Sequence, residues 1–175
     1  SSDLAPLALL FSAGLLVAGC NSDSTEATVK PTPKNVLFFL GDGMGITTLT
    51  ASRIYAYGED GNLTIDTLPE TAFLKTYSHD SQVTDSAPSM AAYMTGVKSN
   101  NGVISMDSAA TQQADCSTSA GKAVTTLLEL AKASGMGTGV VTTTRVTHAT
   151  PAATYAHICN RDLENDIAAQ LVPNG

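Results

Sequence analysis

An unbroken apolar run followed at once by a glycine-flanked aspartate restricts the fold of this chain more than any other feature. Residues 35–40 read Asn-Val-Leu-Phe-Phe-Leu, and Gly41, Asp42 and Gly43 come directly after them. A strand that is apolar at nearly every position must be covered on both faces, as a central strand of a parallel sheet is. The run therefore predicts an α/β fold that displays the Asp42 carboxylate at the end of a strand.

Segments of alternating type follow along the chain. Helices are predicted around residues 49–57 and over 86–98, 122–133 and 162–171, and strands over 71–77 and 138–144. The clearest helix is 122–133, in which Val124, Leu127, Leu128 and Ala131 repeat at the spacing of one helix face. Strands that alternate with helices form a largely parallel sheet, and such sheets bind ligands at the carboxyl ends of their strands.

The charge balance excludes one broad class of partner. The chain has 9 Lys and Arg against 16 Asp and Glu, for a net charge of −7. Proteins that bind nucleic acid cluster basic residues against the phosphate backbone, so we expect no nucleic-acid partner. An anionic small molecule remains compatible with the chain, because a metal ion or an arginine can reverse the local field.

The N-terminal segment differs in character from the rest. Residues 4–18 are almost wholly apolar, are too few to span a bilayer comfortably, and lead into Gly19 and Cys20. This pattern resembles part of a bacterial lipoprotein signal, so we expect a signal over residues 1–20, lipid on Cys20, and a flexible polar linker over 21–33. The expected location is the periplasmic or cell-surface side of a bacterial membrane, reached through the lipid anchor. A buried apolar helix is the alternative.

Cys116 and Cys159 are the two other cysteines. An exported protein meets an oxidising environment in which these two residues can form a disulfide. The sequence leaves a second arrangement open, in which one of them pairs with a cysteine outside residues 1–175.

Asp42 and Ser86 are the first candidates for chemistry. A carboxylate between two glycines suits a divalent cation, although an ordinary turn aspartate fits the same pattern. Ser86 follows Asp85 where a loop turns into a helix of small residues, and a helix N-terminus favours an alkoxide and a bound phosphoryl group. An ordinary N-cap serine is the alternative. Because no general base is close in sequence, a nucleophilic Ser86 requires a metal ion.

His148, Thr150 and Arg161 are the second group of candidates. Pro151 is expected to make Thr150 extended, and residues two apart on an extended chain point the same way, so the imidazole and the hydroxyl can share a site. A surface loop with a stray histidine is equally compatible. Arg161 suits bidentate binding of phosphate, or else pairs with the acidic residues that follow it.

Three blocks of the chain resemble alkaline phosphatases in their residue sequence and in their order along the chain. They are residues 35–45, 83–98 and 140–161, and the resemblance covers roughly residues 34–161. Its most specific part is the sequence DSAPS, at residues 85–89, followed by TGVK at residues 95–98. The resemblance implies a three-layer α/β/α fold with a largely parallel sheet, of which residues 34–175 are the N-terminal part.

The resemblance also implies an activity and its metal ions. Such enzymes hydrolyse phosphate monoesters at a site with two zinc ions and one magnesium ion. Asp42 matches the aspartate that bridges a zinc and the magnesium site, and Thr150 matches the hydroxyl ligand of magnesium. His148 stands where family members differ, some of them having aspartate, and is expected to alter how tightly magnesium is held.

The remaining matches concern the transferred phosphoryl group. Ser86 matches the serine that is phosphorylated during turnover, Arg161 matches the arginine that clamps the phosphoryl oxygens, and Asp85 matches the carboxylate that positions this arginine. Small phosphate monoesters are the implied substrates, and family members often form homodimers.

One departure from the family is large. The family has further zinc ligands far downstream of the arginine, and residues 1–175 contain only three histidines. We therefore expect a fragment of a longer enzyme, with an incomplete sheet and no phosphatase activity of its own. A phosphodiesterase or sulfatase of the same superfamily is one competing interpretation, and a lipoprotein that binds phosphate or metal without turnover is another.

Overall fold

The computed structural model describes residues 35–174. Contacts between residues divide the chain into two units, residues 1–39 and residues 40–175, and every helix of the described part belongs to the second. The expected lipoprotein signal, Cys20 and the linker over residues 21–33 lie outside the described residues. Within residues 35–174 we find no helix with the length and apolar character that a transmembrane span requires.

The first helix, α1, spans Ile46–Tyr57 and confirms the helix predicted before Gly58. Gly58 ends it with a φ of 79°, a left-handed value that glycine adopts without a Cβ penalty. The short 3₁₀ helix η1, Thr64–Thr67, is tied back to α1 by a bidentate ion pair. In this pair Arg53 donates from Nε and Nη2 to the two carboxylate oxygens of Asp66, at 2.8 and 2.5 Å.

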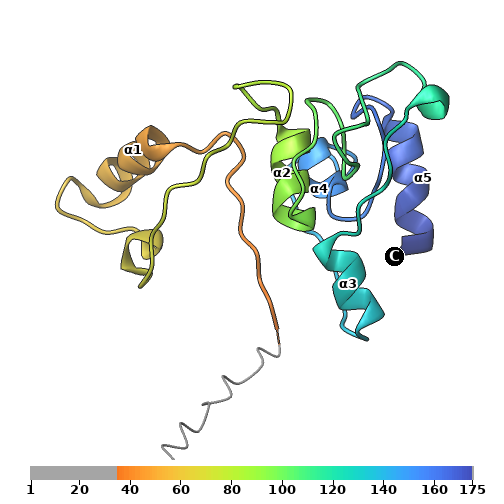
Figure 1. Cartoon of the computed structure of the whole chain (residues 1–175). Helices are drawn as coiled ribbons and strands as arrows, with labels where there is room; N and C mark the ends of the chain where they lie inside the picture. The colour runs from red at the N-terminus through yellow and green to blue at the C-terminus, as the bar shows by residue number, and fades with distance from the viewer. Residues whose placement is uncertain (1–34, 175) are drawn as a thin grey trace, which may run out of the picture. The chain divides into compact units, whose positions relative to one another are not determined.

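The core lies among the later helices (Figure 1). These are α2, Ser86–Thr95, α3, Leu127–Ala133, α4, Ala149–Ala152, and α5, Glu164–Asn174. Helix α2 packs against α4 and α3. Small side chains let these helices approach closely, because Ala87, Ala91, Ala149 and Ala152 are buried between them.

Two isolated antiparallel bridges attach the connecting segments to this core. Ile104 pairs with Ile158, each donating its N–H to the other's carbonyl, at 2.9 and 3.0 Å. Met106 lies opposite Ala123 in the second bridge, where the flanking residues make the hydrogen bonds: Asp107 N donates to Lys122 O and Val124 N donates to Ser105 O, each at 2.9 Å. Ile104 is fully buried, so the first bridge fixes the chain that leads from α4 to α5 against the middle of the core.

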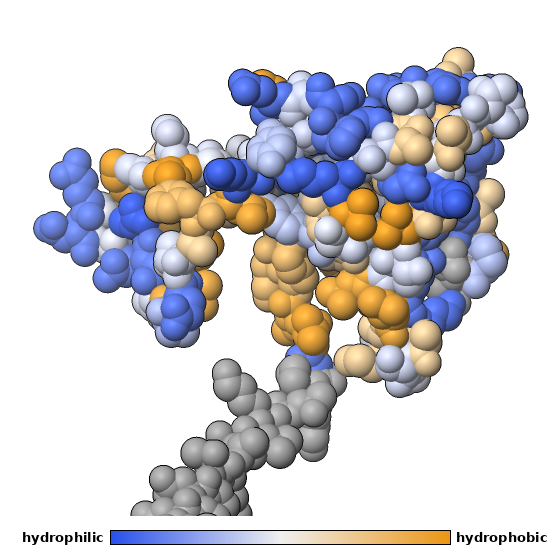
Figure 2. All heavy atoms as spheres, viewed as in Figure 1, coloured by the Kyte–Doolittle hydropathy of each residue, from blue (hydrophilic) through white to orange (hydrophobic). Residues whose placement is uncertain are grey.

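The three predicted strands do not form in residues 35–174. The segments 35–40, 71–77 and 138–144 are irregular, and Phe39 and Phe73 are each 89% exposed. A strand requires a neighbour whose N–H and C=O groups complete its ladder, and the described part of the chain supplies none for these segments. Figure 2 shows apolar residues (orange) on the surface as a result.

The predicted helix 122–133 begins five residues later than expected. Thr126 is the N-cap of α3: its Oγ1 accepts from Glu129 N at 3.2 Å, while Glu129 Oε2 accepts from Thr126 N at 2.7 Å. This capping box stops the helix from extending toward its N-terminus. At the end of α2, Gly96 adopts a φ of 73° and ends the predicted helix 86–98 at Thr95.

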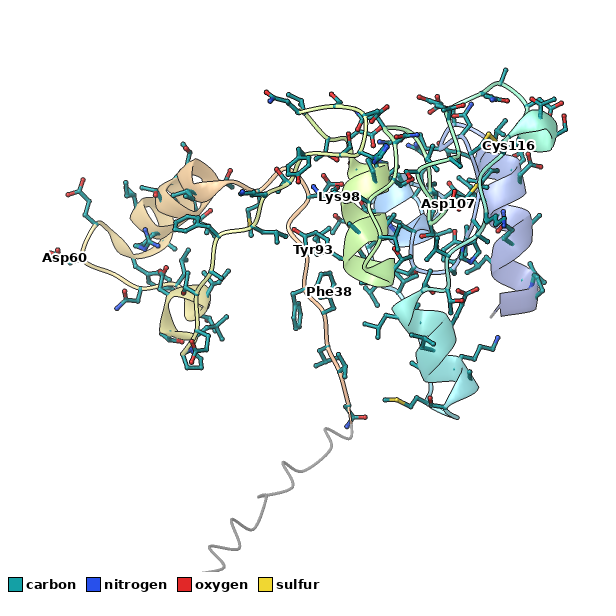
Figure 3. The ribbon with its side chains drawn as sticks, in the orientation of Figure 1. Phe38, Asp60, Tyr93, Lys98, Asp107 and Cys116 are labelled. Carbon is teal, nitrogen blue, oxygen red and sulfur yellow. A yellow bond between two sulfur atoms is a disulfide. The ribbon has the colours of Figure 1, made fainter. Side chains whose placement is uncertain are left out.

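Cys116 and Cys159 form a disulfide, the first of the two arrangements that the sequence left open. Cys116 begins the 3₁₀ helix η2, Cys116–Thr118, and its sulfur also accepts a hydrogen bond from Cys159 N at 3.1 Å. Figure 3 shows this disulfide next to the label of Cys116. The bridge joins the loop after residue 107 to the chain that leads into α5.

Candidate active site

The carboxylate of Asp42 is the centre of a cluster of polar side chains. Its Oδ2 accepts a hydrogen bond of 2.6 Å from Thr150 Oγ1, and its Oδ1 accepts a longer one of 3.3 Å from Ser86 Oγ. Gly43, with a φ of 69°, turns the chain immediately after the aspartate. Three segments that are far apart in sequence therefore meet at one carboxylate.

Ser86 is the first residue of α2, and Asp85 is its N-cap. Asp85 Oδ1 accepts from Ala87 N at 2.9 Å, and this bond satisfies a backbone donor in the first turn of the helix. The alternative in which Ser86 serves as the N-cap is therefore wrong. Its hydroxyl is left to face Asp42 at the positive end of the helix dipole.

Arg161 pairs with Asp85, the N-cap residue of α2. Its Nη1 lies 3.4 Å from Asp85 Oδ2, and its backbone N donates to Gly102 O at 2.8 Å. Gly102 N in turn donates to Asp85 Oδ2 at 3.0 Å. One glycine thus holds both the carboxylate and the backbone of the arginine that pairs with it.

His148 links the arginine to Thr150. Its Nδ1 lies 3.4 Å from Thr150 N, and its Nε2 lies 3.1 Å from Arg161 Nη2. Both neighbours are donors, while a neutral imidazole has only one ring nitrogen free to accept. The two donors face different ring nitrogens, so a neutral ring accepts from only one of them, and the shorter contact with Arg161 is the better hydrogen bond.

The expected extended conformation at Thr150 is wrong. Ala149–Ala152 form the short helix α4, with His148 at its N-cap. Pro151 is tolerated because it lies within the first turn, where its missing N–H leaves no helical hydrogen bond unmade. His148 and Thr150 still share a site, but as the N-cap residue and the second residue of a short helix instead of as alternate residues of an extended chain.

The cluster favours the ionised form of its central carboxylate. The hydrogen bond from Thr150 is the main cause that lowers the pKa of Asp42, and burial opposes it. The Ser86 hydroxyl and the charges of His148 and Arg161 lower this pKa further. The site thus offers an anionic oxygen beside a guanidinium, with a hydroxyl on each side.

An ion pair between Arg145 and Glu164 holds the residues just before His148. Arg145 Nη2 lies 2.7 Å from Glu164 Oε1, and Thr147 Oγ1 donates to Glu164 Oε2 at 2.6 Å. The hydrogen bond from Arg145 is the main cause that lowers the pKa of Glu164 to about 2. The first turn of α5 is therefore tied to the chain that precedes α4.

His157 lies outside this cluster and has a structural role. Its Nδ1 lies 2.8 Å from Ser105 O, and its Nε2 lies 3.0 Å from Glu129 Oε1. Burial alone would raise the pKa of Glu129, but hydrogen bonds from Thr126 N and His157 bring it below its ordinary value. The pair joins the start of α3 to the core.

Two positions that hold the site were missed by the sequence reasoning. They are Gly102, with its φ of 77°, and Gln112, whose side chain lies directly against it. The Asn101-Gly102 pair is a turn signal that would have marked the first. Nothing in the sequence signals Gln112, because its contacts are with residues about fifty positions away.

The donors around Asp42 fit part of a metal centre. A carboxylate and a hydroxyl 2.6 Å apart are the hard oxygen ligands that magnesium prefers. Zinc requires more His, Cys or carboxylate ligands, and within residues 35–174 no group of three or more such side chains is close enough to hold a metal ion.

Comparison with known proteins gives the family. The alkaline phosphatase family model matches residues 33–174. The tissue-nonspecific isozyme of alkaline phosphatase from Felis catus is 50% identical over 139 residues, which cover 76% of this chain and 26% of that protein. Alkaline phosphatase from Gadus morhua is 43% identical over 160 residues, covering 87% of this chain and 33% of that protein. The chain thus spans about a quarter to a third of the length of these relatives.

Solved structures of alkaline phosphatases are also similar to this chain. Alkaline phosphatase from the Antarctic bacterium TAB5 is 31% identical, with a TM-score of 0.64 over 75% of this chain and 34% of that one. The cold-active enzyme from Shewanella sp. is 37% identical, with a TM-score of 0.66 over 77% of this chain and 32% of that one. A TAB5 variant is described with Mg bound in its M3 site. These enzymes have an α/β fold, so the fold class expected from the sequence holds for the family. The chain belongs to the alkaline phosphatase family.

Proposed function

We propose that the complete protein hydrolyses phosphate monoesters through a phosphoserine formed on Ser86. Family membership supports the reaction type. The observation that carries the proposal is the meeting of Ser86, Asp42 and Thr150 at one carboxylate, with the Asp85 and Arg161 pair beside it.

Each residue has a role that its surroundings favour. Ser86 is the nucleophile: its Oγ forms the bond to phosphorus as the bond to the alcohol oxygen breaks. Arg161 binds two oxygens of the phosphoryl group, since a guanidinium presents paired donors to such oxygens. Asp85 orients this guanidinium, and the N-terminus of α2 adds positive potential at the same place. Water then attacks the phosphoserine and releases inorganic phosphate.

Two zinc ions and one magnesium ion would complete the proposed site. When bound, they would lower the pKa of the serine hydroxyl and of water and stabilise negative charge on the leaving oxygen. Asp42 and Thr150 would hold the magnesium, and Asp42 would also hold a zinc. His148 acts on magnesium less directly, because Arg161 donates to its Nε2. The remaining zinc ligands come from outside the described residues.

Substitution of the serine tests the proposal. Ser86→Ala in the full-length protein should abolish nearly all turnover of 4-nitrophenyl phosphate. Ser89→Ala is the matched control, because Ser89 lies in the same helix but donates to Asp85 O at 2.8 Å inside it. The control should keep most of the rate. If Ser86→Ala kept its rate, a different nucleophile would be indicated. A wild-type protein that binds phosphate without any turnover would instead indicate the non-catalytic lipoprotein.

Rates on other esters separate the proposal from its rivals. A monoesterase should turn over 4-nitrophenyl phosphate much faster than the bis-ester or the sulfate. The proposed site, with Arg161, is suited to a phosphoryl group that has three unesterified oxygens, as a phosphate monoester has. A preference for either of the other substrates would favour the phosphodiesterase or the sulfatase.

The location and assembly of the protein belong to the same proposal. A lipid on Cys20 would hold the enzyme at the periplasmic or cell-surface side of a bacterial membrane, where it would form a homodimer. Cys20→Ser should then release the protein from the membrane fraction. Retention of this variant at the membrane would contradict the lipid anchor.

A further inference from the structure

We propose that residues 112–116, here called the strap, position the phosphate-binding Arg161 through the Cys116–Cys159 disulfide and the side chain of Gln112. The inference rests on the proposed function of Arg161. It adds positioning residues that do not themselves touch substrate.

The strap holds both neighbours of Arg161. Gln112 Nε2 donates to Asn160 Oδ1 at 3.1 Å and makes a longer contact of 3.4 Å with Asp162 Oδ2. Asn160 Nδ2 donates to the carbonyl of Gln113 at 2.8 Å. The residues before and after the arginine are therefore both bound to the strap.

The disulfide holds the chain one step further back. Cys159 is fully buried and is joined to Cys116 both by the sulfur–sulfur bond and by the hydrogen bond from Cys159 N to Cys116 Sγ, 3.1 Å long. The covalent bond limits how far Asn160 and Arg161 can move away from the strap. Figure 3 shows the bridge at Cys116.

The opposite side of Arg161 is held by Gly102. Its carbonyl accepts from Arg161 N at 2.8 Å, and its N–H donates to Asp85 Oδ2 at 3.0 Å. The Gln112 carboxamide lies so close to Gly102 that a Cβ there would come within 2.4 Å of it. Gln112 thus covers the same glycine that sets the distance between Arg161 and Asp85.

Bidentate binding requires a guanidinium held in one orientation, so loosening these supports should weaken phosphate binding. It should leave Ser86 in place, because Ser86 is positioned by α2 and by its hydrogen bond to Asp42. The expected signature is a higher KM and a higher inhibition constant for inorganic phosphate, with a smaller change in kcat.

Gln112→Ala in the full-length, metal-loaded protein tests the inference. We expect the dissociation constant of inorganic phosphate, measured by calorimetry, to rise roughly tenfold. This is the size of effect expected if a misoriented Arg161 loses one charge-assisted hydrogen bond to phosphate. Gln113→Ala is the matched control, because the Gln113 side chain forms its hydrogen bonds with Thr111 and Thr118 nearby in sequence, while its carbonyl, which accepts from Asn160, is kept in the variant. The control should bind phosphate as the wild type does.

A double-mutant cycle with Arg161→Ala separates positioning from general loosening of the fold. If the strap acts through Arg161, Gln112→Ala should have no further effect on phosphate binding once the arginine is removed. An equal effect in both backgrounds, or none in either, would overturn the inference. The Cys116→Ser, Cys159→Ser double variant should reproduce the weaker binding if it folds, while the Gln112 variants carry the test if it does not.

The two proposals fail in different ways. A wild-type protein that binds phosphate but does not turn over monoesters contradicts the proposed function, and the calorimetric cycle still tests the strap. A wild-type protein that turns over monoesters, with unchanged phosphate binding in Gln112→Ala, contradicts only the strap. A wild-type protein that binds no phosphate contradicts both.

Discussion

Replacement of Gly102 by alanine tests the packing on which the site depends. Gly102 has a φ of 77°, and an alanine Cβ would come within 2.4 Å of the Cδ and Oε1 of Gln112. The left-handed backbone costs roughly 1–2 kcal/mol for a residue with a Cβ. Gln112 must also move away and lose its bond to Asn160, which adds about 1 kcal/mol. We therefore expect Gly102→Ala to lower the free energy of unfolding by roughly 2–3 kcal/mol.

Gly96→Ala provides the matched control. Gly96 has a similar φ of 73°, but among residues 35–174, apart from its own chain neighbours, nothing lies within 4 Å of the position that its Cβ would take. It should carry only the backbone cost, roughly 1–2 kcal/mol. The excess for Gly102→Ala is therefore the informative quantity, and urea denaturation of the two full-length variants measures it.

A second background identifies the cause of that excess. In Gln112→Ala the obstructing carboxamide is absent, so Gly102→Ala should cost no more than Gly96→Ala. Equal losses for the two glycines in the wild-type background would refute the reasoning. So would an excess that persists after Gln112 is shortened.

Two further predictions concern stability. Thr126→Val keeps the shape of a fully buried residue but removes the cap of α3 and the 2.7 Å hydrogen bond to the Thr154 carbonyl. Thermal or urea unfolding should therefore show a loss of stability of about 2 kcal/mol. An unchanged stability would contradict the capping role. The folded-state pKa of Glu164 is about 2 against an ordinary 4.5, so its ion pair with Arg145 contributes fully above pH 4.5 and is lost as the pH falls toward 2. Acid titration of Glu164→Gln should lack this component of the stability loss, and an identical acid profile would show that the pair contributes nothing.

Helices were the more predictable part of the fold, because their signals are local. The glycine after α1 and the periodic residues of α3 can be read directly from neighbouring positions. The start of α3 was placed too early because the apolar period continues through Val124, whereas the capping box at Thr126 decides where the helix begins. Helix α4 is not predicted from the sequence, because proline disfavours a helical conformation in the residue before it. In the structure Pro151 lies in the first turn of α4, where proline is tolerated.

Strands were predictable only as a tendency. The apolar run before Asp42 has the composition of a buried strand, but forming one depends on partners that a local pattern cannot supply. In residues 35–174 that run stays irregular, with Phe39 largely exposed. The sequence therefore indicated the α/β class of the family without determining which pairings this part of the chain can make.

The candidate site divides in the same way. Asp42, Ser86 and Thr150 were singled out by motifs, and the structure brings their side chains together. Gly102 and Gln112 were not, because what they do depends on contacts between distant segments. Residues that carry chemistry leave motifs, whereas residues that position them become visible only in three dimensions.

The phosphoserine is the central claim, and locating the phosphate on the protein tests it most directly. Full-length, metal-loaded protein can be incubated with inorganic phosphate, quenched in acid, digested and mapped by mass spectrometry. We predict phosphate on Ser86, and none at any site in Ser86→Ala. Phosphate on a different residue, or rapid turnover of monoesters by a protein that never carries phosphate on Ser86, would contradict the account.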